Sequence, residues 1–198
     1  MRIVAAALFA PLLLLTGTPV SALENTPIET LGSGKAEPSR TETLDTLFNT
    51  LKSADDESEA TKAENAIIRL WMDSGSDTID LLMSWAQEAI DDKDYGTALD
   101  FLDRVVTMKP DFAEGWNRRA TVYYLTDKYG HSISDLARVL ALEPRHFGAL
   151  TGLGSIFREI GDDKRAIAAY GEALALDPHL AKVKEALDEL QGDSGDDI

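Results

Sequence analysis

The sequence predicts an all-α protein built as a stack of antiparallel helix pairs. Apolar residues at 44, 47, 48 and 51 follow the i, i+3, i+4, i+7 spacing of an amphipathic helix. Three prolines, Pro110, Pro144 and Pro178, are spaced 34 residues apart, and the residues before each of them follow a common pattern. A fixed period of this length is typical of helical hairpins that repeat along a chain, so the repeat determines the fold class.

Composition and charge exclude several classes of function. The 198 residues carry a formal charge of −16 and no cysteine. A chain without cysteine has no disulfide, no thiolate metal site and no thiol nucleophile. The negative charge argues against nucleic acid and anionic lipid, because binding to either begins with Lys or Arg at phosphate. Most of the excess negative charge lies before and after the repeats, so it does not indicate a strongly basic ligand in a groove.

Residues 1–22 have the pattern of a secretory signal peptide. Arg2 precedes an apolar run over 3–15, and the small residues that end at Ala22 predict cleavage after that residue. The run is shorter than the roughly 20 residues that span a bilayer, so no integral membrane span is expected after cleavage. An exported chain without cysteine favours a bacterial periplasm over a eukaryotic secretory route.

The segments that flank the repeats have distinct patterns. Residues 23–40 lack apolar periodicity and contain Gly, Ser and Pro, which predicts a flexible linker. Residues 41–76 form a degenerate N-terminal helical pair, in which Lys52 and Glu64 occupy places where the repeats have small residues; we expect it to cap the stack. Residues 181–191 predict a C-terminal capping helix that solvates the open end, and 192–198 form an acidic tail.

Three repeats cover 79–112, 113–146 and 147–180. Small residues at the eighth and twentieth positions of each repeat allow its two helices to approach closely. These pairs are Ala86 and Ala98, Ala120 and Ser132, and Gly154 and Ala166. Proline near the end of each repeat stops the second helix. One pair cannot bury its own apolar face, so the three pairs must stack.

This register resembles the tetratricopeptide repeat (TPR) family. The third repeat has the family's residue type at every signature position, whereas Ala89 replaces an aromatic residue in the first repeat and Arg119 replaces a leucine in the second. The resemblance implies a right-handed superhelical TPR solenoid with an N-terminal capping helix pair and a C-terminal solvating helix. It also implies that the first helix of each repeat lines a concave groove that binds a protein or peptide.

The resemblance places the groove on particular residues of this chain. They are Asp80, Met83, Gln87, Ile90, Glu114, Asn117, Arg118, Thr121, Tyr124, Thr151, Ser155 and Arg158. The lining is polar and rich in amides, with a few apolar anchors, which suits an extended peptide or a partner helix; the alternative is a merely solvated surface. A subset of the family grips a C-terminal carboxylate with Lys, Asn and Arg. Only Arg118 is cationic at those places here, so that clamp is absent.

No spacing in the chain predicts catalysis, a metal site or a cofactor. His131, His146 and His179 are far apart in sequence, and we expect them in surface turns. The segment 91–96 lacks calcium-binding side chains at two ligand positions, Lys93 and Tyr95. The sequence therefore favours a protein that is not an enzyme.

Arg119 is unusual because leucine packs at this position in the family. A buried guanidinium requires a partner, and Asp100, Asp103 or Asp135 can serve. A structural ion pair and a contact with a binding partner both remain open. Trp116 nearby occupies a packing position between repeats and is expected in the core.

These patterns lead to one preferred function and two alternatives. The preferred function is a non-enzymatic periplasmic adaptor or scaffold that binds a protein or peptide in the concave groove and supports cell-envelope assembly or integrity. The first alternative is a structural module that self-associates into a homo-oligomer. The second, less favoured, is an enzyme with an unrecognised site.

Overall fold

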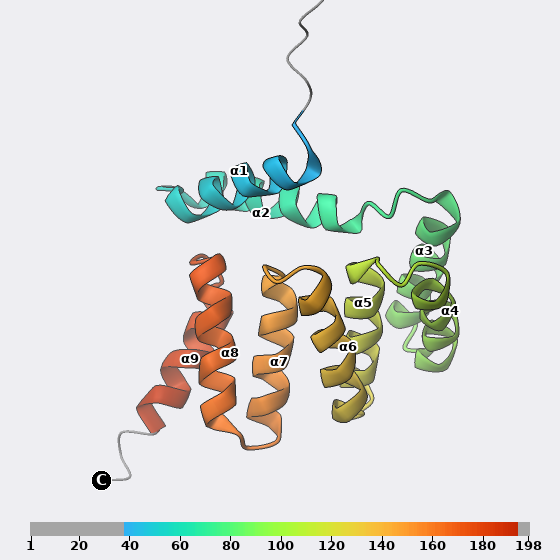
Figure 1. Cartoon of the computed structure of the whole chain (residues 1–198). Helices are drawn as coiled ribbons and strands as arrows, with labels where there is room; N and C mark the ends of the chain where they lie inside the picture. The colour runs from blue at the N-terminus through green and yellow to red at the C-terminus, as the bar shows by residue number, and fades with distance from the viewer. Residues whose placement is uncertain (1–37, 194–198) are drawn as a thin grey trace, which may run out of the picture. The chain divides into compact units, whose positions relative to one another are not determined.

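The computed structural model describes residues 38–193, and every regular element in this range is an α-helix (Figure 1). The expected signal peptide, most of the linker and the end of the acidic tail lie outside the described residues. The helices are α1 (Arg40–Ser53), α2 (Glu57–Met72), α3 (Asp77–Asp91), α4 (Tyr95–Met108), α5 (Ala113–Leu125), α6 (Tyr129–Leu142), α7 (Phe147–Glu159), α8 (Asp163–Leu176) and α9 (Ala181–Asp193). None of these helices is long and apolar enough to cross a membrane.

Helices α3 to α8 form three antiparallel pairs that stack in chain order. Within each pair the two helices pack along their length, α4 then packs on α5 and α6 on α7, and α9 covers α8 (Figure 1). The predicted stack of helix pairs is confirmed. Small residues are required where the helices of a pair meet, since a Cβ on Gly154 would lie 2.4 Å from the ring of Tyr170.

Acidic side chains set where the second helices of two pairs begin. The Asp94 carboxylate accepts the Thr97 N–H at 3.1 Å at the start of α4, and Asp162 accepts the Arg165 N–H at 3.0 Å at the start of α8. Such caps satisfy N–H groups that have no partner within the helix. The sequence motif of the turn between paired helices thus also defines where the second helix starts.

The helical pair expected over 41–76 is present as α1 and α2, but it does not pack along α3. Its apolar face instead contacts Phe147, Leu176 and Leu180, at the turns that join α6 to α7 and α8 to α9. An ion pair of 2.6 Å between Arg145 and Asp45 joins the first of these turns to α1. The pair therefore lies across the ends of the later repeats, and not on the upstream face of the first (Figure 1).

His146 is buried, so the expectation of a surface turn residue is wrong for it. Its side chain is 3% exposed, because Trp71 of α2 stacks on the ring with centroids 4.2 Å apart. The ring also caps α7, since Nδ1 accepts the Ala149 N–H at 3.1 Å. His179 lies in an exposed turn, as expected; His131 is exposed but lies in the first turn of α6, so it is not in the loop that the sequence predicted.

A second buried polar group lies under α2, in the turn between α8 and α9. Asp177 is fully buried, and one carboxylate oxygen accepts the His179 N–H at 2.9 Å while the other has no hydrogen-bond partner. Burial raises the pKa of Asp177 above its ordinary value, although His179 opposes this. Burial, and next the charge of Asp177, also raise the pKa of Glu64 on α2. Ionised Asp177 therefore destabilises the fold.

Replacing Asp177 by asparagine should stabilise the protein at neutral pH by about 1 kcal/mol, since it removes a buried charge and keeps the oxygen that caps the turn. A carboxyl whose folded pKa is raised binds more protons in the folded state, so the wild type gains stability as pH falls through that pKa. The advantage of Asp177→Asn should therefore shrink toward about pH 4, which urea unfolding at both pH values measures. An advantage that does not change with pH would contradict the assignment.

Candidate partner-binding groove

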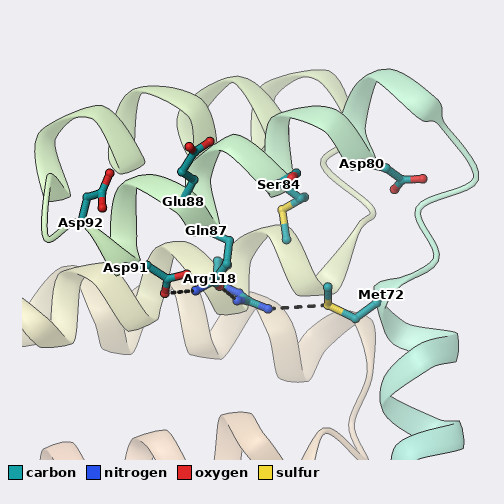
Figure 2. A pocket seen from close by; sticks show the side chains of 9 residues that line it. Met72, Asp80, Ser84, Gln87, Glu88, Asp91, Asp92 and Arg118 are labelled. Carbon is teal, nitrogen blue, oxygen red and sulfur yellow. Dashed lines mark hydrogen bonds between the residues drawn. The ribbon is translucent and has the colours of Figure 1, made fainter.

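A large hollow lies against α3, between the end of α2 and α5. It has a volume of about 640 Å³, and Figure 2 shows the side chains that line it. They are Met72, Asp80, Met83, Ser84, Gln87, Glu88, Asp91, Asp92 and Arg118. We call this the first hollow. Its lining combines two methionines with four carboxylates and one guanidinium, so it offers apolar contact next to negative charge.

Arg118 lies at the floor of the first hollow and connects three helices. Its guanidinium donates to the side-chain oxygen of Gln87 and to Glu114 at 3.2 Å, and Nη2 is 3.6 Å from the sulfur of Met72. Gln87 in turn donates to Asp91 at 2.7 Å, as the dashed lines of Figure 2 show. Because its donors are engaged, Arg118 positions the lining and adds little free positive charge.

Glu114 is buried at 7% exposure and lies beneath this floor. It accepts hydrogen bonds from Asn117 at 3.1 Å and from Arg118, and its other contact is His146 Nε2 at 3.3 Å. Burial would raise the pKa of Glu114, but His146 and Arg118 outweigh it and hold the pKa below its ordinary value. A chain of polar contacts therefore runs from α7 through α5 to α3.

A second, smaller hollow of about 100 Å³ lies where α5 and α7 meet. Its walls are mostly small or apolar. They are formed by Asn117, Ala120, Thr121, Tyr124, Ser132, Leu136, Gly148, Gly152, Ser155 and Ile156. Burial raises the pKa of the Tyr124 phenol, which packs beside the ring of Tyr129 at 5.9 Å. Tyr124 is thus a neutral, partly fixed aromatic side chain at the edge of this second hollow.

The structure divides the twelve predicted groove residues into three groups. The first hollow contains Asp80, Met83, Gln87 and Arg118. The second contains Asn117, Thr121, Tyr124 and Ser155. Neither hollow is lined by Ile90, Glu114, Thr151 or Arg158. Arg158 instead pairs with Glu189 of α9 at 2.7 Å, and Ile90 packs against the core of the first repeat.

Comparison with known proteins identifies the family. A family model for the tetratricopeptide repeat matches residues 147–180. A TPR repeat-containing protein of Rhizobium etli is 41% identical over 172 residues, which cover 87% of this chain and 83% of that protein. The chain belongs to the tetratricopeptide repeat family.

Solved structures agree with this TPR assignment at the level of the fold. The first TPR of Spaghetti, bound to an HSP90 peptide, is 18% identical, with a TM-score of 0.58 over 61% of this chain and 95% of that one. The MamA protein is also 18% identical, with a TM-score of 0.55 over 78% of this chain and 84% of that one. TPR domains bind peptide or protein partners and are typically not catalytic.

Sequence reasoning missed five residues of the first hollow: Met72, Ser84, Glu88, Asp91 and Asp92. Ser84, Glu88 and Asp91 follow Asp80 at helical spacing, so a fuller projection of α3 could have found them. Met72 comes from α2, and no pattern in the repeats indicates its presence. Within the described residues, no group of three or more His, Asp or Glu side chains is arranged to hold a metal ion.

Proposed function

We propose that this TPR protein is a non-enzymatic adaptor that binds an extended segment of a protein partner across the first and second hollows. The observation that carries the proposal is the first hollow, with its open volume and its lining from α2, α3 and α5. Amide side chains at Gln87 and Asn117 can hydrogen-bond a peptide backbone, and Tyr124 supplies rigid contact area. The two hollows share α5, so one segment can reach both.

The lining also indicates the chemistry of the segment. Asp80, Glu88, Asp91 and Asp92 surround the first hollow, and Arg118 is already engaged with Gln87 and Glu114. A negative lining favours a segment with Lys or Arg next to apolar residues, and it disfavours an acidic C-terminal tail. The chain also lacks the set of Lys, Asn and Arg that grips a C-terminal carboxylate in a subset of the family, which likewise disfavours an acidic C-terminal tail. These carboxylates gather along α3 and just beyond its end, and they give the groove a charge preference that the distribution of charge along the sequence did not indicate.

Export to the periplasm is part of the same proposal, with a role in cell-envelope assembly or integrity. Its support is the pattern of residues 1–22, where a charged start and an apolar run precede small residues that end at Ala22. The whole chain has no cysteine, which suits a periplasmic protein that folds without disulfides.

Replacing Asn117 and Tyr124 together by alanine should lower capture of the partner about tenfold, because it removes one backbone-reading amide and one aromatic contact. Capture is measured in Gram-negative cells with a crosslinker that passes the outer membrane but not the inner one, followed by mass spectrometry. Export is then required for any capture. Helical circular dichroism should stay unchanged, since Thr121 and other neighbours keep α5 intact.

A matched control replaces Asn65 and Ile160, which are exposed and line neither hollow, by alanine. This control should capture the partner as the wild type does. Equal capture by the Asn117 and Tyr124 variant would overturn the groove assignment. Capture that needs a crosslinker able to enter the cytoplasm would overturn the export assignment alone.

A further inference from the structure

The helix pair of the first repeat, α3 with α4, has an exposed apolar face that no other described helix covers. Leu81 and Trp85, one turn apart on α3, are 48% and 43% exposed. The Trp85 ring packs beside Phe101 of α4, with ring centroids 5.5 Å apart. A hollow of about 390 Å³ lies over these rings. We call Leu81, Trp85 and Phe101, together with the residues that line this hollow, the open face.

The repeat register shows what such a face does elsewhere in the chain. Advancing Trp85 and Phe101 by one period of 34 residues gives Arg119 and Asp135. In the second repeat Arg119 donates hydrogen bonds to Asp135, and it also donates to Asp103 of α4 at 2.8 Å. The face is therefore the surface on which the second helix of a preceding pair packs.

No preceding pair occupies that place in the described chain. The candidate by sequence order is α1 with α2, but its apolar residues pack on Phe147, Leu176 and Leu180 instead. Trp85 consequently keeps a large exposed area. Its ring nevertheless packs beside Phe101, as expected of a residue at a position that packs between repeats. The open face is thus built to receive a helix, and no helix within residues 38–193 covers it.

The charges around the open face indicate which helix fits. Its hollow is lined by Glu88, Asp92 and Asp94, and none of the residues that line it is a cation. Arg104, one turn beyond Phe101, is exposed on the same side of α4 but does not line the hollow. A second copy of the chain brings a formal charge of −16 to the same surface, which opposes self-association.

We propose that the open face binds an amphipathic helix of a protein partner. Apolar residues of that helix pack on Leu81, Trp85 and Phe101, and its Lys or Arg residues meet the carboxylates of Glu88 and Asp92. The partner helix packs on the first repeat in the way that α4 packs on the second repeat. The apolar residues of this surface, Leu81, Trp85 and Phe101, line neither hollow of the groove, whereas Glu88 and Asp92 are shared with the first hollow.

The test uses two labelled synthetic peptides of roughly 18 residues, about five helical turns. Both carry leucine at i, i+3, i+4 and i+7 spacing; one has lysine flanking the stripe and the other glutamate. Fluorescence anisotropy with the purified protein should show binding of the lysine peptide and at least about tenfold weaker binding of the glutamate peptide. Replacing Trp85 and Phe101 by alanine should weaken binding of the lysine peptide about tenfold.

Two control variants separate this surface from others. Replacing Leu125 and Ile160, exposed at 45% and 47%, by alanine removes similar apolar area elsewhere and should leave binding unchanged. The Asn117 and Tyr124 variant should also bind the lysine peptide normally, which distinguishes failure of this inference from failure of the groove. Circular dichroism verifies that each variant is folded.

Several results would overturn the inference. They are no binding of the lysine peptide, equal binding of the glutamate peptide, and unchanged binding by the Trp85 and Phe101 variant. A benzophenone side chain placed at Leu81 in the free protein reports other occupants. Crosslinked dimers would assign the face to a second copy, and an internal crosslink to residues 1–37 would assign it to the chain's own N-terminal segment.

Discussion

Replacing Trp71 by alanine should lower the free energy of unfolding by about 3–5 kcal/mol, the range typical of a large aromatic residue lost from a core. Trp71 is 5% exposed and stacks on His146 with the two rings 11° from parallel. It also packs against Phe48 and Phe147, at ring-centroid distances of 6.1 and 5.0 Å. The indole therefore joins α1, α2 and the start of α7, and its removal should release the N-terminal pair.

Urea unfolding measures the loss, and hydrogen exchange locates it. Amides of α1 and α2 should lose more protection than those of α8. Trp85→Ala is the matched control, since that side chain is 43% exposed and its loss should cost less than about 1 kcal/mol. Trp71→Phe should cost less than Trp71→Ala, because it keeps the ring and removes a buried indole N–H that has no hydrogen-bond partner. Equal destabilisation by Trp71→Ala and Trp85→Ala would contradict the docking of the N-terminal pair.

Replacing Asp135 by alanine should destabilise the protein by about 3 kcal/mol, because it leaves the largely buried Arg119 guanidinium with one exposed partner. Arg119 Nε and Nη2 each donate to Asp135, at 2.7 and 2.8 Å, and Nη1 donates to Asp103 at 2.8 Å. The guanidinium also lies over the Trp116 ring, 4.8 Å from its centroid. The hydrogen bonds to Asp135 and Asp103 raise the pKa of Arg119 against the effect of burial.

Two further variants test this ion pair. Asp103 is 58% exposed at its side chain, so Asp103→Ala should cost less than about 1 kcal/mol. The double variant Arg119→Leu with Asp135→Ala reproduces the third repeat, which has Leu153 and Ala169 at these places. It should unfold within about 1 kcal/mol of the wild type, since a well-packed apolar pair can replace a buried ion pair. A double variant as unstable as Asp135→Ala would show that the ion pair stabilises the fold by more than the neutralisation of two buried charges.

Arg119 illustrates how far the sequence reached. Its place in the register predicted a buried guanidinium that needs a partner, and spacing limited the choice to Asp100, Asp103 and Asp135. In the structure Arg119 pairs with Asp103 and Asp135, whereas Asp100 is exposed. Arg119 therefore forms a structural ion pair. A repeat allows such a prediction because each position recurs in a known environment. Trp116 was expected in the core, and it is only partly buried, with its indole N–H donating to the Pro110 carbonyl at 3.1 Å.

The groove was less accessible to sequence reasoning. The register predicts which residues of α3, α5 and α7 share a side, but not how deep each of them lies. Glu114 is at a predicted groove position and is nevertheless buried, in contact with Arg118 and with His146, on which Trp71 of α2 stacks. Met72, at the end of α2, lines the first hollow. Whether the predicted residues bind a partner remains a prediction that the Asn117 and Tyr124 variant tests.

The sequence by itself determined the helix pairs, their order and the close contact within each pair. These features depend on local spacing, since apolar periodicity, small residues and a proline every 34 residues all act within one repeat or between neighbours. Only the tertiary structure decided where α1 and α2 dock, and with them the burial of His146, the depth of the first hollow and the exposure of Trp85. That docking joins residues such as Phe48 and Phe147, which are far apart in the chain and packed by shape, and shape complementarity between distant segments leaves no periodic pattern in a sequence.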